Sequence, residues 1–277
     1  MSEPNHQFSI LAVPPLFRAT AQGRTRKGLQ ESNPQDYISG VKQRVAACAL
    51  MLAATLGAGA QTSDALWQKA VEIARVAKPW VPGVAVMLVD VKDDKGKLTD
   101  TAESTFRLKP DADGKPVVTV ERFIQNGTDQ TAKQQQAQEK RAKDSKGQSL
   151  SFSLGDNPFD PDLQGEIRVV RLDQPRQIGE KLCASYTYEL KTKSATVEGS
   201  AALDPQTGAP VEVSYSPKPL PFGVQSLTTV LRFADGPDGE GYVKEVVVDG
   251  SGGFLFMKRI FHSTVTLDEY WKTQEAS

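Results

Sequence analysis

The stretch that decides the fold spans residues 201–271 and ends, over residues 226–271, in SLTTVLRFADGPDGEGYVKEVVVDGSGGFLFMKRIFHSTVTLDEYW. Apolar residues recur in it at every second position, for example at Leu227, Leu231 and Phe233. This spacing is typical of half-buried strands in an antiparallel sheet with one wet and one dry face. Clusters of Asp, Gly and Pro at 235–239 and 249–253 predict the turns between the strands. The stretch therefore predicts an antiparallel meander.

The same pattern recurs upstream, so that we expect roughly ten or eleven strands in all. The further strands are expected at residues 83–91, 98–109, 116–126, 165–173, 181–192, 195–204 and 210–218. One amphipathic helix is expected at residues 65–78, with Asp64 among its N-cap candidates. Large antiparallel sheets twist and curl. The predicted fold class is mainly β (α+β), a strongly curved antiparallel sheet or incomplete β-barrel.

Two segments interrupt the strands in the middle of the chain. Residues 128–148 are almost wholly polar, so we expect a solvated helix or a flexible excursion outside the core. Residues 149–164 mix apolar side chains, such as Phe159, with Pro and Gly that break regular structure. They predict a loop with a short helix, either a lid-like segment over the sheet or a packing loop.

The N-terminal region has the pattern of an export signal. Residues 1–40 show no useful period and are interpreted as disordered, or as a leader placed before the true translation start. Residues 41–60 carry a basic start, an apolar run of roughly 12 residues and a small-residue cleavage site, which predict a signal peptide cut after Ala60. Cys48 follows a lipobox-like tripeptide, but most of the apolar run lies after it, so its lipidation stays open. The expected location is periplasmic or secreted.

Composition excludes several classes of protein. The chain has 277 residues with a formal net charge of −1, 39% hydrophobic and 24% charged residues. This balance is ordinary for a globular protein and argues against a nucleic-acid binder, which needs a basic surface. After cleavage Cys183 would be the single cysteine, and we expect it to be a small buried apolar residue.

Motifs for catalysis or metal binding are missing from the sequence. His262 would be the one histidine of the processed chain, and its alternation with Phe261 and Val265 predicts a structural strand residue. There is no G-x-S-x-G nucleophile elbow and no His or Cys cluster with metal-ligand spacing. Gly252-Gly253 precedes a strand, not a helix, so it predicts no phosphate site. We therefore expect no enzyme, no metal and no cofactor, although a hydrolase would remain open if His262 met a hydroxyl and a carboxylate.

A signal peptide, a first amphipathic helix, a long meander and a lid-like middle segment together resemble the outer-membrane lipoprotein-sorting family (LolA/LolB-like). The C-terminal pattern GSAALDPQTGAPVEVSYSPKPLP, followed by GGFLFMKRIFHSTVTLDEYW, is similar to that of LolA-like secreted proteins. The resemblance implies one LolA-like β domain over residues 61–277, an incomplete barrel around a hydrophobic cavity closed by helices. It also implies an arginine that contacts the acyl ligand, for which Arg122 and Arg232 are the candidates.

These observations predict a periplasmic carrier that shelters an acyl chain, a lipid or a lipoprotein in an apolar half-barrel cavity. Its expected partners are that ligand and, transiently, a membrane or envelope protein; we expect no nucleic acid, and a monomer. The expected lining is apolar: Tyr215, Leu227, Leu231, Phe233, Val246 and Val248 from the sheet, with Leu66, Trp67 and Val71 from the helix. The alternative is a structural or interaction module of the envelope whose sheet is fully packed by its own helices.

Overall fold

The computed structural model describes residues 64–112, 114, 116–144, 157–192, 195–235, 241–254 and 257–273. All of them fall in one compact unit of the chain. The predicted leader at 1–40 and the signal peptide at 41–60 lie outside the described residues, as do 145–156 of the predicted polar and lid-like segments.

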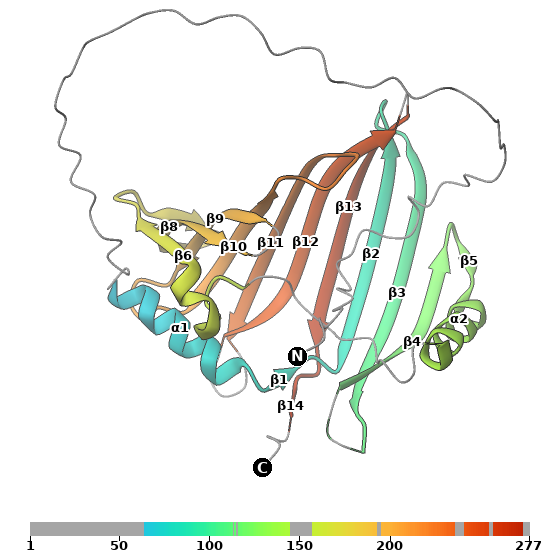
Figure 1. The fold of residues 1–277 in the computed structure, drawn as a ribbon, viewed down its shortest axis with the longest axis horizontal. Helices are drawn as coiled ribbons and strands as arrows, with labels where there is room; N and C mark the ends of the chain where they lie inside the picture. Colours follow the sequence, from blue (N-terminus) through green and yellow to red (C-terminus); the bar gives the residue numbers. More distant parts are fainter. Residues whose placement is uncertain are drawn as a thin grey trace, which may run out of the picture. The chain divides into compact units, whose positions relative to one another are not determined.

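A large open antiparallel sheet dominates the fold (Figure 1). Twelve strands belong to it, in the order β5-β4-β3-β2-β13-β12-β11-β10-β9-β8-β6, with β7 paired to β8 beside this path. Two more short strands, β1 and β14, pair with each other. The strands are β1 (Trp80–Val81), β2 (Val84–Asp93), β3 (Leu98–Pro110), β4 (Pro116–Gln125), β5 (Thr128–Asp129), β6 (Ile167–Arg171), β7 (Arg176–Ile178), β8 (Lys181–Lys191), β9 (Thr196–Leu203), β10 (Pro210–Lys218), β11 (Val224–Asp235), β12 (Gly241–Phe254), β13 (Met257–Asp268) and β14 (Trp271–Lys272). The predicted fold class is confirmed: the sheet is not closed into a barrel.

The chain order and the spatial order differ at one seam. Strands β8 to β13 form the meander predicted from the C-terminal half, and β2 to β4 form a second meander. The two meanders join where β2 pairs with β13, with Val91 opposite Phe261 and Ala85 opposite Leu267. The last long strand, β13, is therefore an inner strand of the sheet, and the two ends of the sheet are β5 and β6.

The predicted turn at 249–253 is wrong. β12 continues through these residues to Phe254, and Gly250 pairs with Phe261 of β13. A Cβ atom on Gly250 would lie 2.1 Å from Cζ of Phe261, so the ring occupies the space above the glycine. An aromatic side chain across a glycine stabilises a strand that would otherwise be weak. The Gly-rich stretch is thus a strand because of its neighbour, which local sequence does not reveal.

Helix α1 (Ala65–Ala77) is the predicted amphipathic helix, and Asp64 is its N-cap. The side chain of Asp64 accepts hydrogen bonds from the backbone N–H groups of Leu66 and Trp67, which the first turn of a helix leaves unsatisfied. Trp67, Ala70 and Val71 are buried on the sheet side of the helix, which packs against β9 and β12. A hydrophobic stripe in the sequence therefore placed this helix correctly.

Two further helical elements flank the sheet. The 3-10 helix η2 (Pro161–Glu166) packs against α1 and β8, which confirms the expected short helix in the middle segment. Helix α2 (Thr131–Asp144) lies beside β4 (Figure 1) and shows that residues 131–144 of the polar segment are helical. No described helix is both long and apolar enough to cross a bilayer.

Candidate ligand-binding site

The apolar face of the sheet carries the residues that the sequence predicts as a lining. Tyr215, Leu231, Val246 and Val248 belong to the buried core, as do Trp67 and Val71 of α1, while Leu66, Leu227 and Phe233 are partly buried against that core. Register explains their common face: Leu231 pairs with Val213 and Val246, which in turn pairs with Val265. The sequence thus grouped these side chains correctly on one face, and most of that group is packed core.

An aromatic cluster fixes α1 on this face. The ring of Trp67 lies 4.7 Å from that of Phe159 and 5.5 Å from that of Tyr186, measured between centroids. Its indole N–H donates to Oε1 of Gln164 in η2, over 3.0 Å. Phe159 is fully buried, so the part of the middle segment that the structure describes, from residue 157 on, packs against α1.

Asp64 ties the start of α1 to the sheet. Besides capping the helix, it accepts a hydrogen bond of 2.7 Å from the hydroxyl of Tyr186 and forms an ion pair with Arg171 at 3.2 Å. Burial alone would raise the pKa of Asp64, but the bonds from Tyr186, Trp67, Arg171 and Leu66 together hold this pKa below its usual value. Burial and the carboxylate of Asp64 both raise the pKa of the Tyr186 hydroxyl. The helix therefore has a fixed position over the sheet.

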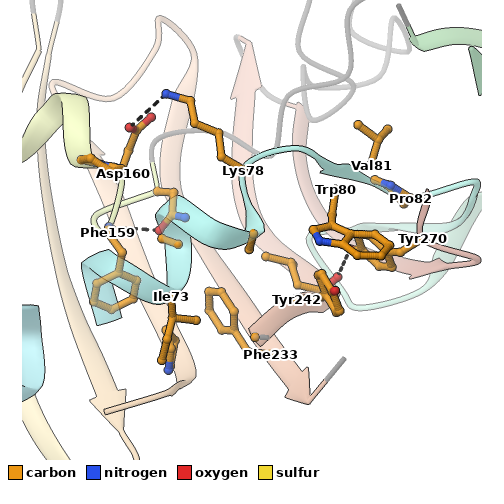
Figure 2. Close-up of a pocket in the computed structure, with 17 residues that line it drawn as sticks. Ile73, Lys78, Trp80, Val81, Pro82, Phe159, Asp160, Phe233, Tyr242 and Tyr270 are labelled. Atoms are coloured by element: carbon orange, nitrogen blue, oxygen red, sulfur yellow. Dashed lines mark hydrogen bonds and ion pairs between the residues drawn. The ribbon is translucent and has the colours of Figure 1, made fainter. Parts of the chain in front are cut away.

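A cavity of about 360 Å³ opens beside this anchored helix (Figure 2). Small-molecule sites typically have volumes of about 300–1,000 Å³ and mostly apolar walls. The wall comes from the end of α1, the segment after it, the start of η2, and the adjoining ends of β11 and β12: Ile73, Ala74, Ala77, Lys78, Trp80, Val81, Pro82, Asn157, Phe159, Asp160, Pro161, Pro210, Phe233, Gly241, Tyr242, Val243 and Tyr270. The cavity is thus large enough for a small apolar ligand or for part of an alkyl chain.

Three aromatic rings form one wall of the cavity (Figure 2). Tyr242 and Tyr270 stack with centroids 4.8 Å apart, and Trp80 meets Tyr242 edge-on at 5.6 Å. The hydroxyl of Tyr270 donates to the backbone carbonyl of Val243, and burial raises the pKa of this hydroxyl. Pairing of β1 with β14 positions Trp80 close to Tyr270, with Val81 opposite Trp271. Residues far apart in the chain therefore build a rigid apolar wall.

Charged groups stand at the other side of the cavity. Nζ of Lys78 lies 2.6 Å from a carboxylate oxygen of Asp162 and 3.8 Å from one of Asp160. The hydrogen bond with Asp162 raises the pKa of Lys78 and lowers the pKa of Asp162. This cluster carries two carboxylates and one ammonium group, so the apolar cavity has a polar, solvated rim.

Sequence reasoning found only part of this wall. Of the nine residues predicted as lining, Phe233 lies in it. Trp80 follows the end of the helix in the segment Pro79-Trp80-Val81-Pro82, and Tyr270 follows the last long strand. Trp80 lies in the two-residue strand β1 and Tyr270 directly precedes β14. Both stand outside the predicted elements, where a large aromatic side chain is unusual in a simple turn, and this was the available signal. Tyr242 belongs to a predicted strand but faces the cavity at the start of β12.

The two arginine candidates lie on the wrong face. Arg232 stands between Leu231 and Phe233 and forms ion pairs with Glu245 and Glu212 on the polar face. Arg122 forms an ion pair with Glu103 at 2.7 Å and is about half exposed. Successive side chains of a strand point to opposite faces, so neither arginine contacts the apolar lining.

His262 does meet a carboxylate and a hydroxyl. Its Nδ1 lies 2.7 Å from Oδ1 of Asp249, and its Nε2 lies 3.2 Å from Oγ1 of Thr264. The three side chains stand on neighbouring strands of the polar face, with His262 and Asp249 at least half exposed. A hydrolase also needs donors for an oxyanion and a cleft that excludes water. On this open face the group is an exposed, hydrogen-bonded pair of side chains with a hydroxyl neighbour.

Cys183 has the buried position that its sequence context predicts. It is free and fully buried, and burial raises the pKa of its thiol, which makes it less reactive. Within the described residues, no group of three or more His, Cys, Asp or Glu side chains could hold a metal ion. The cavity is therefore the feature of the described structure best suited to a ligand.

Comparison with known proteins gives structural similarities alone. No family model matches the chain, and no curated protein matches it. Among solved structures, one similar chain is described as an outer membrane lipoprotein-sorting protein domain from Vibrio parahaemolyticus, with 12% identity, a TM-score of 0.38 and coverage of 76% of this chain and 95% of that one. A LolA superfamily protein from Nitrosomonas europaea has 11% identity, a TM-score of 0.34 and coverage of 76% and 93%.

A DUF1329 family protein from Desulfovibrio piger is similar at 11% identity, with a TM-score of 0.36 and coverage of 77% and 94%. The family that the sequence resembles is thus found among the similar structures. Because the TM-scores are below 0.5, these similarities carry no argument about what this chain binds. The proposals below rest on its own residues.

Proposed function

We propose that this protein is a non-enzymatic binding or carrier protein that shelters an apolar ligand, such as an acyl chain, a lipid or the acyl part of a lipoprotein. The observation that carries the proposal is the cavity of about 360 Å³ beside α1, with its wall of Trp80, Tyr242, Tyr270 and Phe233. Most of the residues around it are apolar or aromatic, and the polar ones, Lys78, Asn157 and Asp160, lie at one side.

The gain from such binding is large enough to matter. Transfer of a methylene group from water to an apolar site contributes about 0.8 kcal/mol, so a chain of about 14 carbons would gain on the order of 10 kcal/mol. Lost translational and rotational freedom then costs several kcal/mol. With a cost of about 4 kcal/mol, about 6 kcal/mol remains, which corresponds to a dissociation constant of tens of micromolar for a long alkyl chain, if part of that chain also contacts the adjoining sheet face.

The predicted signal peptide at 41–60 supports a location of this function in the periplasm or outside the cell. There an apolar ligand needs protection from water as it moves between membranes. In this proposal the protein works as a monomer and contacts a membrane or envelope protein only to load and unload. Near-neutral charge is compatible with such brief contacts and not with a nucleic-acid partner.

A second candidate is a structural or interaction module of the envelope that holds no ligand. It is favoured by the complete burial of Leu231, Val246 and Trp67, which leaves no free space at those positions. Native mass spectrometry of protein purified from the periplasm without detergent separates the two. A reproducible adduct that organic solvent releases as lipid supports the carrier, whereas a clean mass that stays unchanged when lipid is added supports the packed module.

A cavity-filling variant tests the location of the ligand. Ala77 lines the cavity at the end of α1, and Ala77→Trp would place an indole in it. The matched control is Ala132→Trp, at an exposed position of α2. We expect Ala77→Trp to weaken binding of cis-parinaric acid by about tenfold or more, because the ring takes the place of several methylene groups, and the control to bind as the wild type does. Equal affinities in all three proteins would show that the ligand binds elsewhere.

A further inference from the structure

Strand β4 has an outer edge that no long strand covers. On its inner side β4 pairs with β3 from Ala102 to Pro110, while on its outer side β5 pairs only with Ile124 and Gln125. The edge from Pro116 to Phe123 instead faces helix α2 (Figure 1). Edge strands with free N–H and C=O groups readily pair with another chain, so proteins usually protect them.

Side chains of α2 bind the backbone of this edge as a neighbouring strand would. The amide of Gln138 accepts from the N–H of Val120 over 3.3 Å and donates to the carbonyl of Val118. Gln135 donates to the carbonyl of Val120 over 2.8 Å. One step further, the hydroxyl of Thr131 accepts from the N–H of Phe123 over 2.9 Å. Side-chain amides thus take the positions of peptide groups along β4.

Polar bonds of this kind hold α2 in place, since the helix has no apolar stripe. Its sequence, TAKQQQAQEKRAKD, contains no large hydrophobic residue, and its described side chains are exposed or half-buried. A helix that packs by hydrogen bonds alone gains little from hydrophobic burial. The contact with β4 is therefore specific in geometry and weak enough to open.

The edge beneath α2 has little charge to repel another copy. Glu121 forms an ion pair with Arg107, and Arg122 forms one with Glu103, so both charges of the strand are balanced within its own sheet. Pro116 removes one donor at the start of the strand, which protects only that end. If β4 paired with itself about a two-fold axis perpendicular to the sheet, Val118 and Val120 of both copies would lie on the same apolar face.

We propose that α2 is a surrogate strand that blocks self-association, and that release of α2 turns the β4 edge into an antiparallel β4–β4 interface with a second copy of this chain. The helix occupies the hydrogen-bonding groups that this pairing needs, and the strand beneath it is self-complementary in faces and neutral in charge. The cavity beside α1 takes no part in this interface, so the proposal stands apart from the binding function.

The test compares three variants of the purified protein by sedimentation velocity and native mass spectrometry over a range of concentrations. Gln135→Ala/Gln138→Ala removes the glutamine bonds to β4, and Gln134→Ala/Gln136→Ala is the matched control on the same helix. We expect the first variant to dimerise with an affinity at least about tenfold higher than the wild type, since three hydrogen bonds to the edge are lost. The control should match the wild type. A monomeric first variant at every soluble concentration would overturn the proposal.

A third variant establishes which edge forms the dimer. Adding Val120→Pro to Gln135→Ala/Gln138→Ala removes the outward N–H that Gln138 binds, and proline is tolerated on an edge. We expect this triple variant to return to the monomer. Hydrogen exchange supplies a second readout: the amides of Val120 and Phe123 should exchange faster in the diluted double variant and become protected again as it dimerises. Dimers that persist in the triple variant would contradict β4 pairing.

Discussion

Replacing Asp64 with Ala should loosen the helix that borders the cavity and destabilise the whole domain. The substitution removes the N-cap of α1, worth about 1 kcal/mol, and the charged acceptor of the buried Tyr186 hydroxyl, worth about 1.5–3 kcal/mol. The ion pair with the half-exposed Arg171 adds at most about 1 kcal/mol. Together these losses predict a decrease of about 3 kcal/mol in the free energy of unfolding.

Urea unfolding followed by tryptophan fluorescence measures this loss, because Trp67 lies in the affected cluster. For a slope of about 2–3 kcal/mol per molar urea, the midpoint should fall by about 1–1.5 M. Asp64→Asn keeps a capping oxygen and loses the charge, so it should lose about half as much. A midpoint for Asp64→Ala equal to that of the wild type would refute the assignment of Asp64 as the anchor of α1.

The same variants predict a dependence on pH. The pKa of Asp64 is lower in the folded protein than its ordinary value of 3.8. Its charge therefore stabilises the fold fully above pH 3.8, and this contribution is lost as the pH falls through the lower folded pKa. The difference in stability between the wild type and Asp64→Asn should be constant near neutral pH and shrink below pH 3.8. A difference that is unchanged in acid would contradict the role of the charge.

Three further predictions concern two glycines and His262. Gly208→Ala should destabilise the protein by about 1–3 kcal/mol more than Gly96→Ala. Both glycines have a φ of +79°, but a Cβ on Gly208 would lie 2.6 Å from Cβ of Lys69, while a Cβ on Gly96 would meet open space. Thermal unfolding compares the two variants, and equal losses of stability would contradict the clash. Gly250→Ala should destabilise by about 1–3 kcal/mol, and Phe261→Leu in the same protein should restore part of the loss; additive losses in urea unfolding would count against the ring covering the glycine. His262→Ala should change stability by less than about 1 kcal/mol and leave cis-parinaric acid binding unchanged, whereas a loss of any measured hydrolysis would revive a catalytic role.

The elements that the sequence predicted well are those with a long local pattern. The stripe of α1, its cap and the alternation of the long strands each extend over many residues, and the structure confirms them. β1, β5, β7 and β14 have two or three residues each, too few for a period to show, so the expected number of strands was too low. The predicted turn at 249–253 failed because a ring on the neighbouring strand, Phe261, stabilises the glycines.

The candidate site was harder to predict because its wall is assembled from separate regions. The parity of a strand would have placed Arg232 on the face opposite Leu231, so that error could have been avoided from the sequence. Trp80 and Tyr270 come together only through the pairing of β1 with β14, which no local pattern encodes. The glutamines of α2 look like an ordinary solvated face, and their role follows only from the position of β4 beside them.

The pairing of β2 with β13 also governs how the chain can fold. Each strand of the C-terminal meander can pair with the strand before it as soon as it is made. The pairing of β2 with β13 instead joins the first long strand to the last, so the entropy cost of closing the loop between them is high. Until β13 is available, β2 and β12 both present open edges, and partly folded chains with such edges aggregate. Completion of the sheet is thus a late step after synthesis, and folding should be slow and sensitive to protein concentration. A chain built in this way benefits from a holding factor that keeps it unfolded until its last strand is made.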